Sequence, residues 1–339
     1  MPAAQFFIAL ALGLLATGLS LVLMRRIGRV DAPGARHTHL IPTPRAGALG
    51  IALIVFCLVY AHAGSELWLL TALAGLGLLD DFFPQPAFLR MALQFAFCCF
   101  AAYGLGDVWP DGPIFLVRLA LILAAVWIIN AANFFDGRNG LLAGNFTVFL
   151  FALPMIGIRW EMALPLAGLW IGFLPFNFPR AKIFMGDVGS YLIGATLAWL
   201  MLHTAQISLV QLLAILVAMS SMIADPTLTL ILRIVQGKPF WRAHRQHLYQ
   251  LLSRTGLSDT KLLVNYLVYA CLSFLMARWI TMQTSLNACY LTALWCVLSS
   301  LLWGYSRRNI LRMHRHSNRY ARVDNKLEKL KKQNGARDL

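Results

Sequence analysis

The sequence predicts an all-α, polytopic integral membrane protein of about eleven transmembrane helices. Of its 339 residues, 59% are hydrophobic and 13% are charged, whereas a soluble domain carries about a quarter charged residues. Apolar stretches of about 20 residues, long enough to cross a hydrocarbon core of about 30 Å, recur along the chain. At this length only helices satisfy their own backbone polar groups in lipid, so the class is α-helical.

Eleven apolar stretches can be delimited. They cover approximately residues 4–24, 46–63, 65–80, 87–106, 113–132, 139–158, 160–178, 188–205, 207–225, 262–281 and 286–305. The first begins "MPAAQFF", without a basic n-region or a clear small-residue cleavage site, and we interpret it as a retained helix. Residues 1–305 are therefore expected to form one multi-helix transmembrane domain, and residues 306–339 a basic tail.

The formal net charge of +15 is distributed unevenly. When the segments between helices are assigned alternately to two faces, nearly all Lys and Arg fall on the second face or in the tail, and only Arg118, Arg159 and Arg278 fall elsewhere. Because Lys and Arg collect in cytoplasmic loops, the N-terminus is predicted outside and the C-terminus in the cytoplasm. The basic tail is more simply explained by attraction to anionic lipid than by nucleic-acid binding, because the sequence shows no folded nucleic-acid-binding domain.

Acidic residues cluster at helix ends on the predicted cytoplasmic face. Asp80 and Asp81 follow the run "LLTALAGLGLL" directly. Two adjacent carboxylates repel each other unless they share a cation or a proton, which favours a functional role over compensation of the basic face.

A second polar patch, "NAANFFDGRNGLLAG", follows an apolar run. Asn130, Asn133 and Asp136 step by three residues, so neighbours in the series share one face of a helical turn. Amides together with a carboxylate suit a hydrated divalent cation or a polar ligand. A helix C-cap with packing glycines is the alternative, but it leaves the three polar side chains unexplained.

The third patch, "FNFPRAKIFMGDVGS", contains Pro179, which ends the incoming helix, and "GDVGS", which opens the next one. Asp187 and Ser190 could simply cap that helix. A carboxylate at a helix N-terminus beside Lys182 also forms a place for Mg²⁺ with a phosphate. The residues of this patch leave both interpretations open.

The fourth patch, "WRAHRQHLYQLL", lies in the longest cytoplasmic loop. His244 and His247 are expected one helical turn apart, with Arg245 between them. Too few ligands are nearby for zinc, so cationic or donor contacts to a pyrophosphate are favoured over a plain interfacial loop. All four patches share one membrane face, and together they suit a Mg²⁺-nucleotide diphosphate whose second substrate comes from the lipid.

These motifs, in this order and preceded by "VDAPGARHTHLIPTPRAG" at residues 30–47, resemble those of the polyprenyl-phosphate N-acetylhexosamine-1-phosphate transferases. "HRQHLYQ" is most similar to the branch that initiates O-antigen or capsule chains. The resemblance implies transfer of N-acetylhexosamine 1-phosphate, from GlcNAc or a 6-deoxy relative such as FucNAc or QuiNAc, from a UDP-sugar to undecaprenyl phosphate, with release of UMP. It also implies Mg²⁺, with Mn²⁺ as a substitute, and an active site on the cytoplasmic side of the bacterial inner membrane.

The resemblance also implies residue roles. Asp187 and Asn133 would hold the metal, Asp80 would deprotonate or orient the lipid phosphate, Asp81 would assist it near the metal, and Asp136 would position the nucleotide end. The implied substrate contacts are Asn130, Lys182, His244, Arg245 and His247, with His39 and Arg45 guiding the lipid phosphate. Asp225, which precedes Pro226, serves either sugar choice or loop anchoring.

This chain departs from the family pattern at two positions. Asn139 stands where the family usually has an acid, and Ala48 where it has a second glycine. The expected partners are a UDP-N-acetylhexosamine, undecaprenyl phosphate and membrane lipid, with a homodimer as an open alternative and no nucleic acid.

Two rival classes fit less well. A transporter or lipid flippase would place ionisable residues along a path through the bilayer, whereas here they stop at one face. A CDP-alcohol phosphatidyl transferase would need aspartates on adjacent turns of two helices, an arrangement that the sequence lacks.

Overall fold

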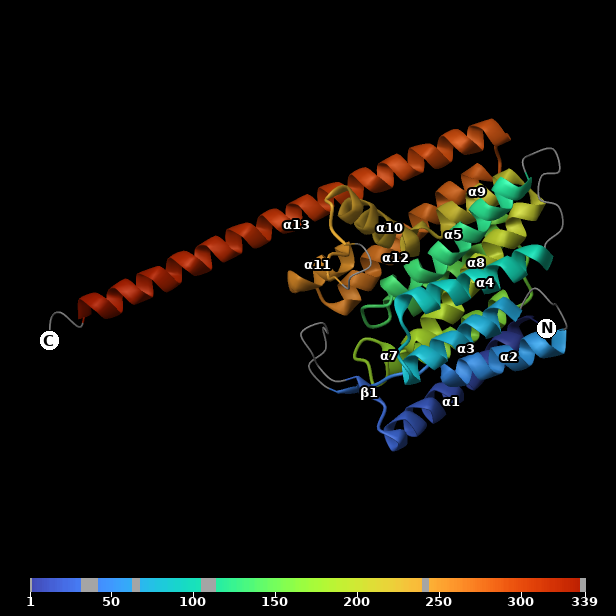
Figure 1. Ribbon diagram of the computed structural model, residues 1–339, viewed down its shortest axis with the longest axis horizontal. Helices are drawn as coiled ribbons and strands as arrows, with labels where there is room; N and C mark the ends of the chain where they lie inside the picture. The colour runs from blue at the N-terminus through green and yellow to red at the C-terminus, as the bar shows by residue number, and fades with distance from the viewer. Residues whose placement is uncertain (1, 32–41, 63–67, 105–113, 240–243, 336–339) are drawn as a thin grey trace.

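The computed structural model describes residues 2–31, 42–62, 68–104, 114–239 and 244–335. Within these ranges the chain folds into helices that lie side by side in a bundle, and one pair of two-residue strands lies at the end of the bundle near α11 (Figure 1). The expected all-α class is confirmed.

The elements follow one another in a simple order. The helices are α1 (Pro2–Ile27), α2 (Leu49–His62), α3 (Trp68–Phe82), α4 (Ala87–Gly104), α5 (Ile114–Phe135), α6 (Leu141–Ala152) with the 3₁₀ turn η2 (Leu153–Ile156), α7 (Ala163–Asn177), α8 (Gly186–Ile207), α9 (Leu209–Ala218), α10 (Ser220–Val235), α11 (Leu248–Arg254), α12 (Asp259–Ile280) and α13 (Ser285–Gly335). Strand β1 (Val30–Asp31) pairs antiparallel with β2 (Thr43–Pro44). Each predicted apolar stretch overlaps at least one of these helices.

The described helices include several that are suited to a bilayer. Five are long and apolar enough to cross it: α1, α5, α8, α12 and the first part of α13; the bent pair α9 and α10 makes a sixth if counted as one span. These helices indicate a multi-pass α-helical membrane protein. The total of eleven spans and their orientation remain predictions.

The break between α9 and α10 corrects the predicted stretch 207–225. The two helix axes differ by 79°, and α10 continues to Val235 with Asp225 inside it rather than at a helix end. Apolar composition is continuous across this break, but the two helices have different main neighbours. Helix α9 lies mainly against α12 and α8, and α10 lies mainly against α5 and to a lesser extent against α12.

Helix α8 forms the centre of the bundle and positions the polar end. It is buried along most of its length and packs against α3 and α5. Gly77 of α3 permits the closest approach, since a Cβ there would collide with the backbone of Asp187. Small residues let helices in lipid pack backbone to backbone, so the polar ends of α3 and α8 are held together.

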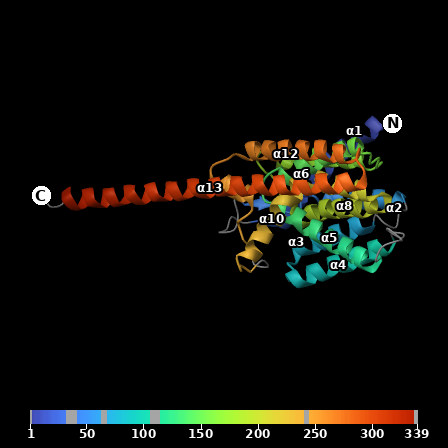
Figure 2. The same ribbon diagram turned by 90° about the horizontal axis from the view of Figure 1, so that it is seen from above.

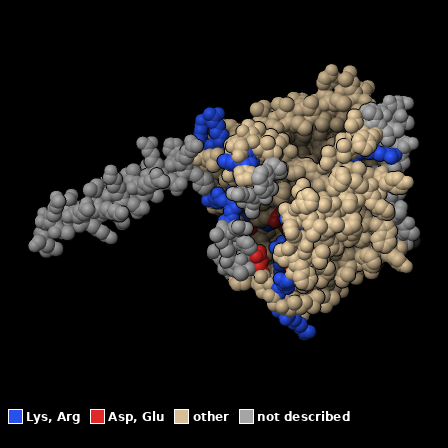
Figure 3. Space-filling model, in the orientation of Figure 1, with Lys and Arg blue, Asp and Glu red and all other residues tan. Residues whose placement is uncertain are grey.

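The last helix, α13, leaves the bundle at the same end as β1 and α11 and projects well beyond it in both views (Figure 1, Figure 2). It runs without a break across the predicted boundary at residue 305. Lys and Arg side chains gather at this end around a recess in which acidic atoms are visible, whereas most of the flank facing the viewer carries no charge (Figure 3).

Candidate active site

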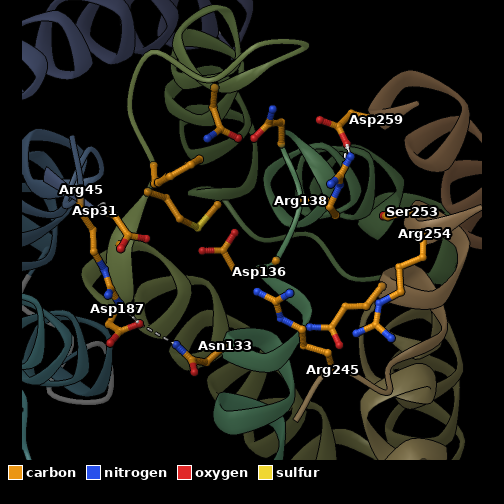
Figure 4. A pocket seen from close by; sticks show the side chains of 17 residues that line it. Asp31, Arg45, Asn133, Asp136, Arg138, Asp187, Arg245, Ser253, Arg254 and Asp259 are labelled. Atoms are coloured by element: carbon orange, nitrogen blue, oxygen red, sulfur yellow. Dashed lines mark hydrogen bonds and ion pairs between the residues drawn. The ribbon is translucent and has the colours of Figure 1, made fainter. Parts of the chain in front are cut away.

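A cavity of about 610 Å³ opens at the polar end of the bundle. Figure 4 shows Asp31, Arg45, Asn133 and Asp187 on one side, Arg138, Arg254 and Asp259 on the other, and Asp136 between the two groups. The wall is completed by Gly137, Asn139, Asn177, Phe184, Met185, Gly186, Arg245, Gln250 and Ser253. The structure thus brings together parts of the second, third and fourth sequence patches and Arg45.

Asp187 and Asn133 meet at the carboxylate side of this cavity. The Nδ2 atom of Asn133 donates to Asp187 Oδ1 at 2.9 Å and to the Oγ of Ser190 at 2.9 Å. Arg45 Nη2 lies 2.8 Å from the same Asp187 oxygen. The N-cap of α8 is Met185, with no side-chain cap bond, so the capping interpretation of Asp187 and Ser190 is wrong.

Asp81 caps α8 instead. Its Oδ1 accepts the backbone N–H of Asp187 at 2.9 Å, and its Oδ2 accepts that of Val188 at 3.0 Å. Arg45 Nε lies 2.7 Å from Asp81 Oδ1. Gly186 has φ 78°, and a Cβ there would collide with the Asp81 carboxylate. A glycine is therefore needed at the start of α8 for this contact.

Asp80 makes different contacts from Asp81, because consecutive helical residues do not face each other, although its carboxyl group also interacts with that of Asp187. Its Oδ1 accepts the backbone N–H of Gln85 at 2.6 Å and its Oδ2 pairs with Arg90 Nη1 at 2.6 Å. Asp80 is buried and is not part of the cavity wall. Each of the adjacent carboxylates thus pairs with its own arginine, Asp80 with Arg90 and Asp81 with Arg45.

Asp136 lies directly after the end of α5, with its carboxylate in the middle of the cavity (Figure 4). Burial raises the pKa of Asp136 to about 7, the negative charge of Asp187 adds to this effect, and Arg45 opposes it. Burial disfavours the charged form of Arg45, but Asp187 and Asp81 outweigh burial and raise its pKa. The cavity therefore concentrates negative charge around one guanidinium.

Asn130, the first residue of the three-residue series, faces away from the cavity. Its Nδ2 donates to Gln94 Oε1 at 2.6 Å and to the carbonyl of Val126 at 2.8 Å. Lys182 is exposed, with its ammonium 5.8 Å from the centre of the Phe176 ring, and it does not line the cavity. His39 lies outside the described residues.

The opposite side of the cavity is basic. Arg138 forms an ion pair with Asp259, and Arg245 and Arg254 lie nearby (Figure 4). Asn139, which replaces the usual family acid, donates from Nδ2 to the carbonyl of Pro179 at 3.1 Å. A carboxylate at this position could not donate that bond.

The histidine motif is not helical at its start. Helix α11 begins at Leu248, so His244 and His247 precede it, which corrects the expected one-turn spacing. Their ring centroids are nevertheless 4.9 Å apart. Burial and the neighbouring His247 and Arg233 lower the pKa of His244 to about 4, and burial also lowers the pKa of His247. At pH 7 both rings are neutral, so they act as neutral donors or acceptors.

Asp225 holds this motif in place. Its carboxylate accepts the backbone N–H groups of Leu248 at 2.7 Å and Tyr249 at 3.1 Å. It also accepts bonds from Tyr266 Oη at 3.1 Å and Trp303 Nε1 at 2.9 Å. A carboxylate with this many protein donors is suited to loop anchoring, and the geometry favours that alternative over sugar choice.

Sequence reasoning missed several residues of the wall. Asp31, Arg138, Gln250, Ser253, Arg254 and Asp259 line the cavity without having been singled out as ligand contacts. Arg138 lies inside the second motif and Gln250 inside the fourth, so counting every polar residue of these motifs would have found both. Ser253 and Arg254 directly follow the fourth motif, so extending it by one helical turn would have found them. Asp31 and Asp259 lie outside the four motifs, and no sequence pattern marks them as ligand contacts.

Comparison with known proteins identifies the family of this chain. The model of glycosyl transferase family 4 matches residues 64–205. The decaprenyl-phosphate N-acetylglucosaminephosphotransferase of Mycobacterium leprae is 30% identical over 305 residues, covering 74% of this chain and 76% of that protein.

Two further relatives show the same range of similarity. The undecaprenyl-phosphate alpha-N-acetylglucosaminyl 1-phosphate transferase of Escherichia coli K12 is 30% identical, covering 71% of this chain and 73% of that protein. A probable undecaprenyl-phosphate N-acetylglucosaminyl 1-phosphate transferase of Bacillus subtilis is 28% identical, covering 78% and 80%. The chain therefore belongs to glycosyl transferase family 4, the family of the polyprenyl-phosphate N-acetylhexosamine-1-phosphate transferases.

Proposed function

We propose that this protein transfers N-acetylhexosamine 1-phosphate from a UDP-sugar to undecaprenyl phosphate and releases UMP. The observation that carries the proposal is the cavity itself, in which Asp187, Asn133 and Asp136 face Arg138, Arg245 and Arg254 at the polar end of a membrane bundle. Acidic oxygens on one side suit a cation, and guanidinium groups on the other suit phosphate oxygens. The names of the similar proteins support the same reaction.

The residues present fit a magnesium ion. Carboxylate and amide oxygens of Asp187, Asp136 and Asn133 line one cavity, and such hard oxygen donors are what Mg²⁺ prefers. Among the described residues no three His, Cys, Asp or Glu side chains form a complete metal cluster. Mg²⁺ usually takes one or two carboxylates and completes its shell with water and substrate phosphates, which agrees with Asp187 and Asn133 as the principal protein ligands.

In the proposed reaction an oxygen of the lipid phosphate attacks the sugar-bearing phosphorus of the UDP-sugar. The bond from that phosphorus to the bridging oxygen breaks, and the electron pair leaves with UMP. A bound Mg²⁺ would neutralise charge on the diphosphate. Arg138, Arg245 and Arg254 would orient phosphate oxygens, since phosphoryl transfer depends mainly on positioning and charge stabilisation.

The two carboxylates Asp136 and Asp80 are proposed to have different roles in the reaction. Asp136 projects into the cavity and accepts no hydrogen bond from the residues that the structure describes, which leaves it able to take a proton from the acceptor phosphate or to bind the nucleotide end. Asp80 could act as the acceptor base only by leaving Arg90. We therefore assign the removal of the proton from the acceptor phosphate to Asp136, and a positioning role to Asp80.

The proposals for the donor sugar and the pathway rest on the names of the similar proteins and on one sequence motif. The similar proteins are named for N-acetylglucosamine, whereas the motif "HRQHLYQ" resembles enzymes that accept 6-deoxy N-acetylhexosamines. We propose initiation of an O-antigen, lipopolysaccharide or other envelope polysaccharide at the cytoplasmic face of the inner membrane. The basic residues concentrated around the cavity support that orientation.

Mass spectrometry of the lipid product tests the proposal. Purified protein is incubated with undecaprenyl phosphate, Mg²⁺ and, in turn, UDP-GlcNAc, UDP-FucNAc and UDP-QuiNAc. A lipid-linked pyrophosphoryl sugar formed with stoichiometric UMP is expected for one donor. Release of UDP instead of UMP, or no product with any donor while an active homologue works in parallel, would reject it.

A further inference from the structure

Tyr249 of α11 is buried, and its hydroxyl group contacts the end of the helix that precedes Asp136. Its side chain is 1% exposed and does not line the cavity. The Oη atom donates to the backbone carbonyl of Phe134 at 2.8 Å. Helix α5 ends at Phe135, and the last four carbonyl groups of a helix have no N–H partner within it. Tyr249 therefore supplies a hydrogen bond that the end of α5 lacks.

A second contact of Tyr249 lies on the other side of Asp136. A Cβ atom on Gly137 would collide with the Tyr249 Oη and would lie 2.7 Å from its Cζ. The phenol ring therefore packs directly on the backbone of Gly137, and only a glycine leaves room for it. Because these two contacts are made at Phe134 and Gly137, they hold the chain on both sides of Asp136.

Tyr249 is itself held from several directions. Its backbone N–H donates to Asp225 Oδ2 at 3.1 Å. Its ring meets Phe135 edge-on with centroids 5.8 Å apart, and it stacks on His247 with centroids 5.7 Å apart. Gln250, which lines the cavity, donates from Nε2 to the Tyr249 Oη at 3.2 Å. These contacts make the ring a fixed support for the end of α5.

The direction of the Asp136 carboxylate depends on this support. The carboxylate accepts no hydrogen bond from the residues that the structure describes, so the backbone that carries it decides where it lies. Burial raises the pKa of Tyr249, and the negative charges of Asp225 and Asp136 raise it further. The phenol hydroxyl therefore stays protonated at physiological pH and remains able to donate to α5.

We propose that Tyr249 is a positioning residue for Asp136, and that it holds the turn after α5 so that the Asp136 carboxylate projects into the cavity. The inference rests on the proposed function, in which Asp136 takes the proton from the acceptor phosphate. A general base must lie within hydrogen-bond reach of that proton, and a displacement of about 1 Å can cost about a hundredfold in rate. Tyr249 acts through Asp136, since it does not line the cavity.

Tyr249→Phe tests this role, because phenylalanine keeps the ring and removes the hydroxyl bond to α5. Tyr269→Phe is the matched control, since the Tyr269 Oη donates to Ser299 Oγ at 2.9 Å and Tyr269 does not line the cavity. In Tyr249→Phe, kcat should fall about tenfold or more, while the dissociation constant for UDP-sugar stays within about twofold of wild type. Tyr269→Phe should leave both values within about twofold of wild type.

Two kinetic outcomes would overturn the role of Tyr249. An equal kcat in Tyr249→Phe and Tyr269→Phe would show that the hydroxyl bond does not position the base. A loss of UDP-sugar affinity as large as the loss of kcat would show that Tyr249 acts on the nucleotide site and not through Asp136.

Hydrogen exchange followed by mass spectrometry tests the turn without turnover. Peptides that cover residues 134–141 should exchange faster in Tyr249→Phe than in wild type or Tyr269→Phe, with exchange elsewhere unchanged, because a lost hydrogen bond raises local opening. Faster exchange there in a protein without transferase activity would retain the hold of Tyr249 on this turn and reject the proposed function. Exchange equal to wild type would reject the positioning role and leave the proposed function intact.

Discussion

The Oδ1 atom of Asp81 accepts the backbone N–H of Asp187 at 2.9 Å. This bond joins the end of α3 to the start of α8 and gives Asp81 a structural task. Because Asp81 holds Asp187 through the backbone, the carboxylate of Asp187 lies in the cavity wall, where Arg45 and Asn133 contact it. Two aspartates that the sequence presents as similar thus have different roles.

That difference can be measured. Asp81→Asn should destabilise the protein by about 1–3 kcal/mol, because one amide cannot accept two backbone N–H bonds and an arginine as well. Asp187→Asn should leave the melting temperature nearly unchanged and abolish turnover, since an amide is a weaker Mg²⁺ ligand than a carboxylate. Thermal unfolding and initial rates on both purified variants check this. Equal loss of stability in the two variants would contradict the division of roles.

Asp136 should make stability depend on pH. Its pKa of about 7 lies above the usual range of aspartate, so the folded state keeps the proton to higher pH than the unfolded state. Stability from this group therefore falls as pH rises from about 4 to about 7 and stays low above that. In EDTA, Asp136→Asn should melt a few degrees higher than wild type at about pH 8, with a smaller difference at about pH 5. A difference that does not vary with pH would contradict the burial of an ionising Asp136.

Activity should require a divalent cation. The negative charges of Asp136 and Asp187 are close enough to perturb one another, and added Mg²⁺ should relieve this and neutralise the diphosphate. EDTA should remove turnover, and Mg²⁺ or Mn²⁺ should restore it. Full turnover in chelated, metal-free membranes would show that the proposed metal role is incorrect.

Asp80 can be separated from the nucleotide site by binding. Its oxygens accept the backbone N–H of Gln85 and pair with Arg90, and its carboxyl group also interacts with that of Asp187. Asp80→Asn should lower kcat while leaving UDP-sugar affinity largely intact, because Asp80 does not line the cavity and the change is expected to act through its contact with Asp187. Calorimetric titration with UDP-sugar checks this, with Arg245→Gln as the comparison that should weaken binding. Loss of nucleotide binding in Asp80→Asn comparable to that in Arg245→Gln would place Asp80 in the nucleotide site.

The predicted orientation has its own test. A reporter at the C-terminus should read cytoplasmic, and one inserted at residues 107–112 should read outside, because Lys and Arg gather around the cavity end of the bundle. An untagged active protein serves as the expression control. The reverse reading at either position would place the cavity on the other side of the membrane.

The sequence by itself determined the helical class, the approximate positions of the apolar helices and the polar patches that meet at one end. These features are local in the chain: hydropathy over about 20 residues defines a span, and Asn133, Asp136 and Asp187 lie in short motifs beside helix ends. The link between Asn133 and Asp187 is implied by the family resemblance, because the two residues lie in separate motifs of the chain.

Only the tertiary structure decided which charges pair. Asp80 and Asp81 are adjacent in the chain, yet one pairs with Arg90 and the other with Arg45. Asp225 reaches Trp303 across 78 residues, a contact for which hydropathy carries no signal. The bend between α9 and α10 likewise lies within a continuous apolar run. Hydrophobic pattern specifies that a segment is buried in protein or lipid, but the direction of each helix and the partner of each buried polar group depend on how the helices pack against one another.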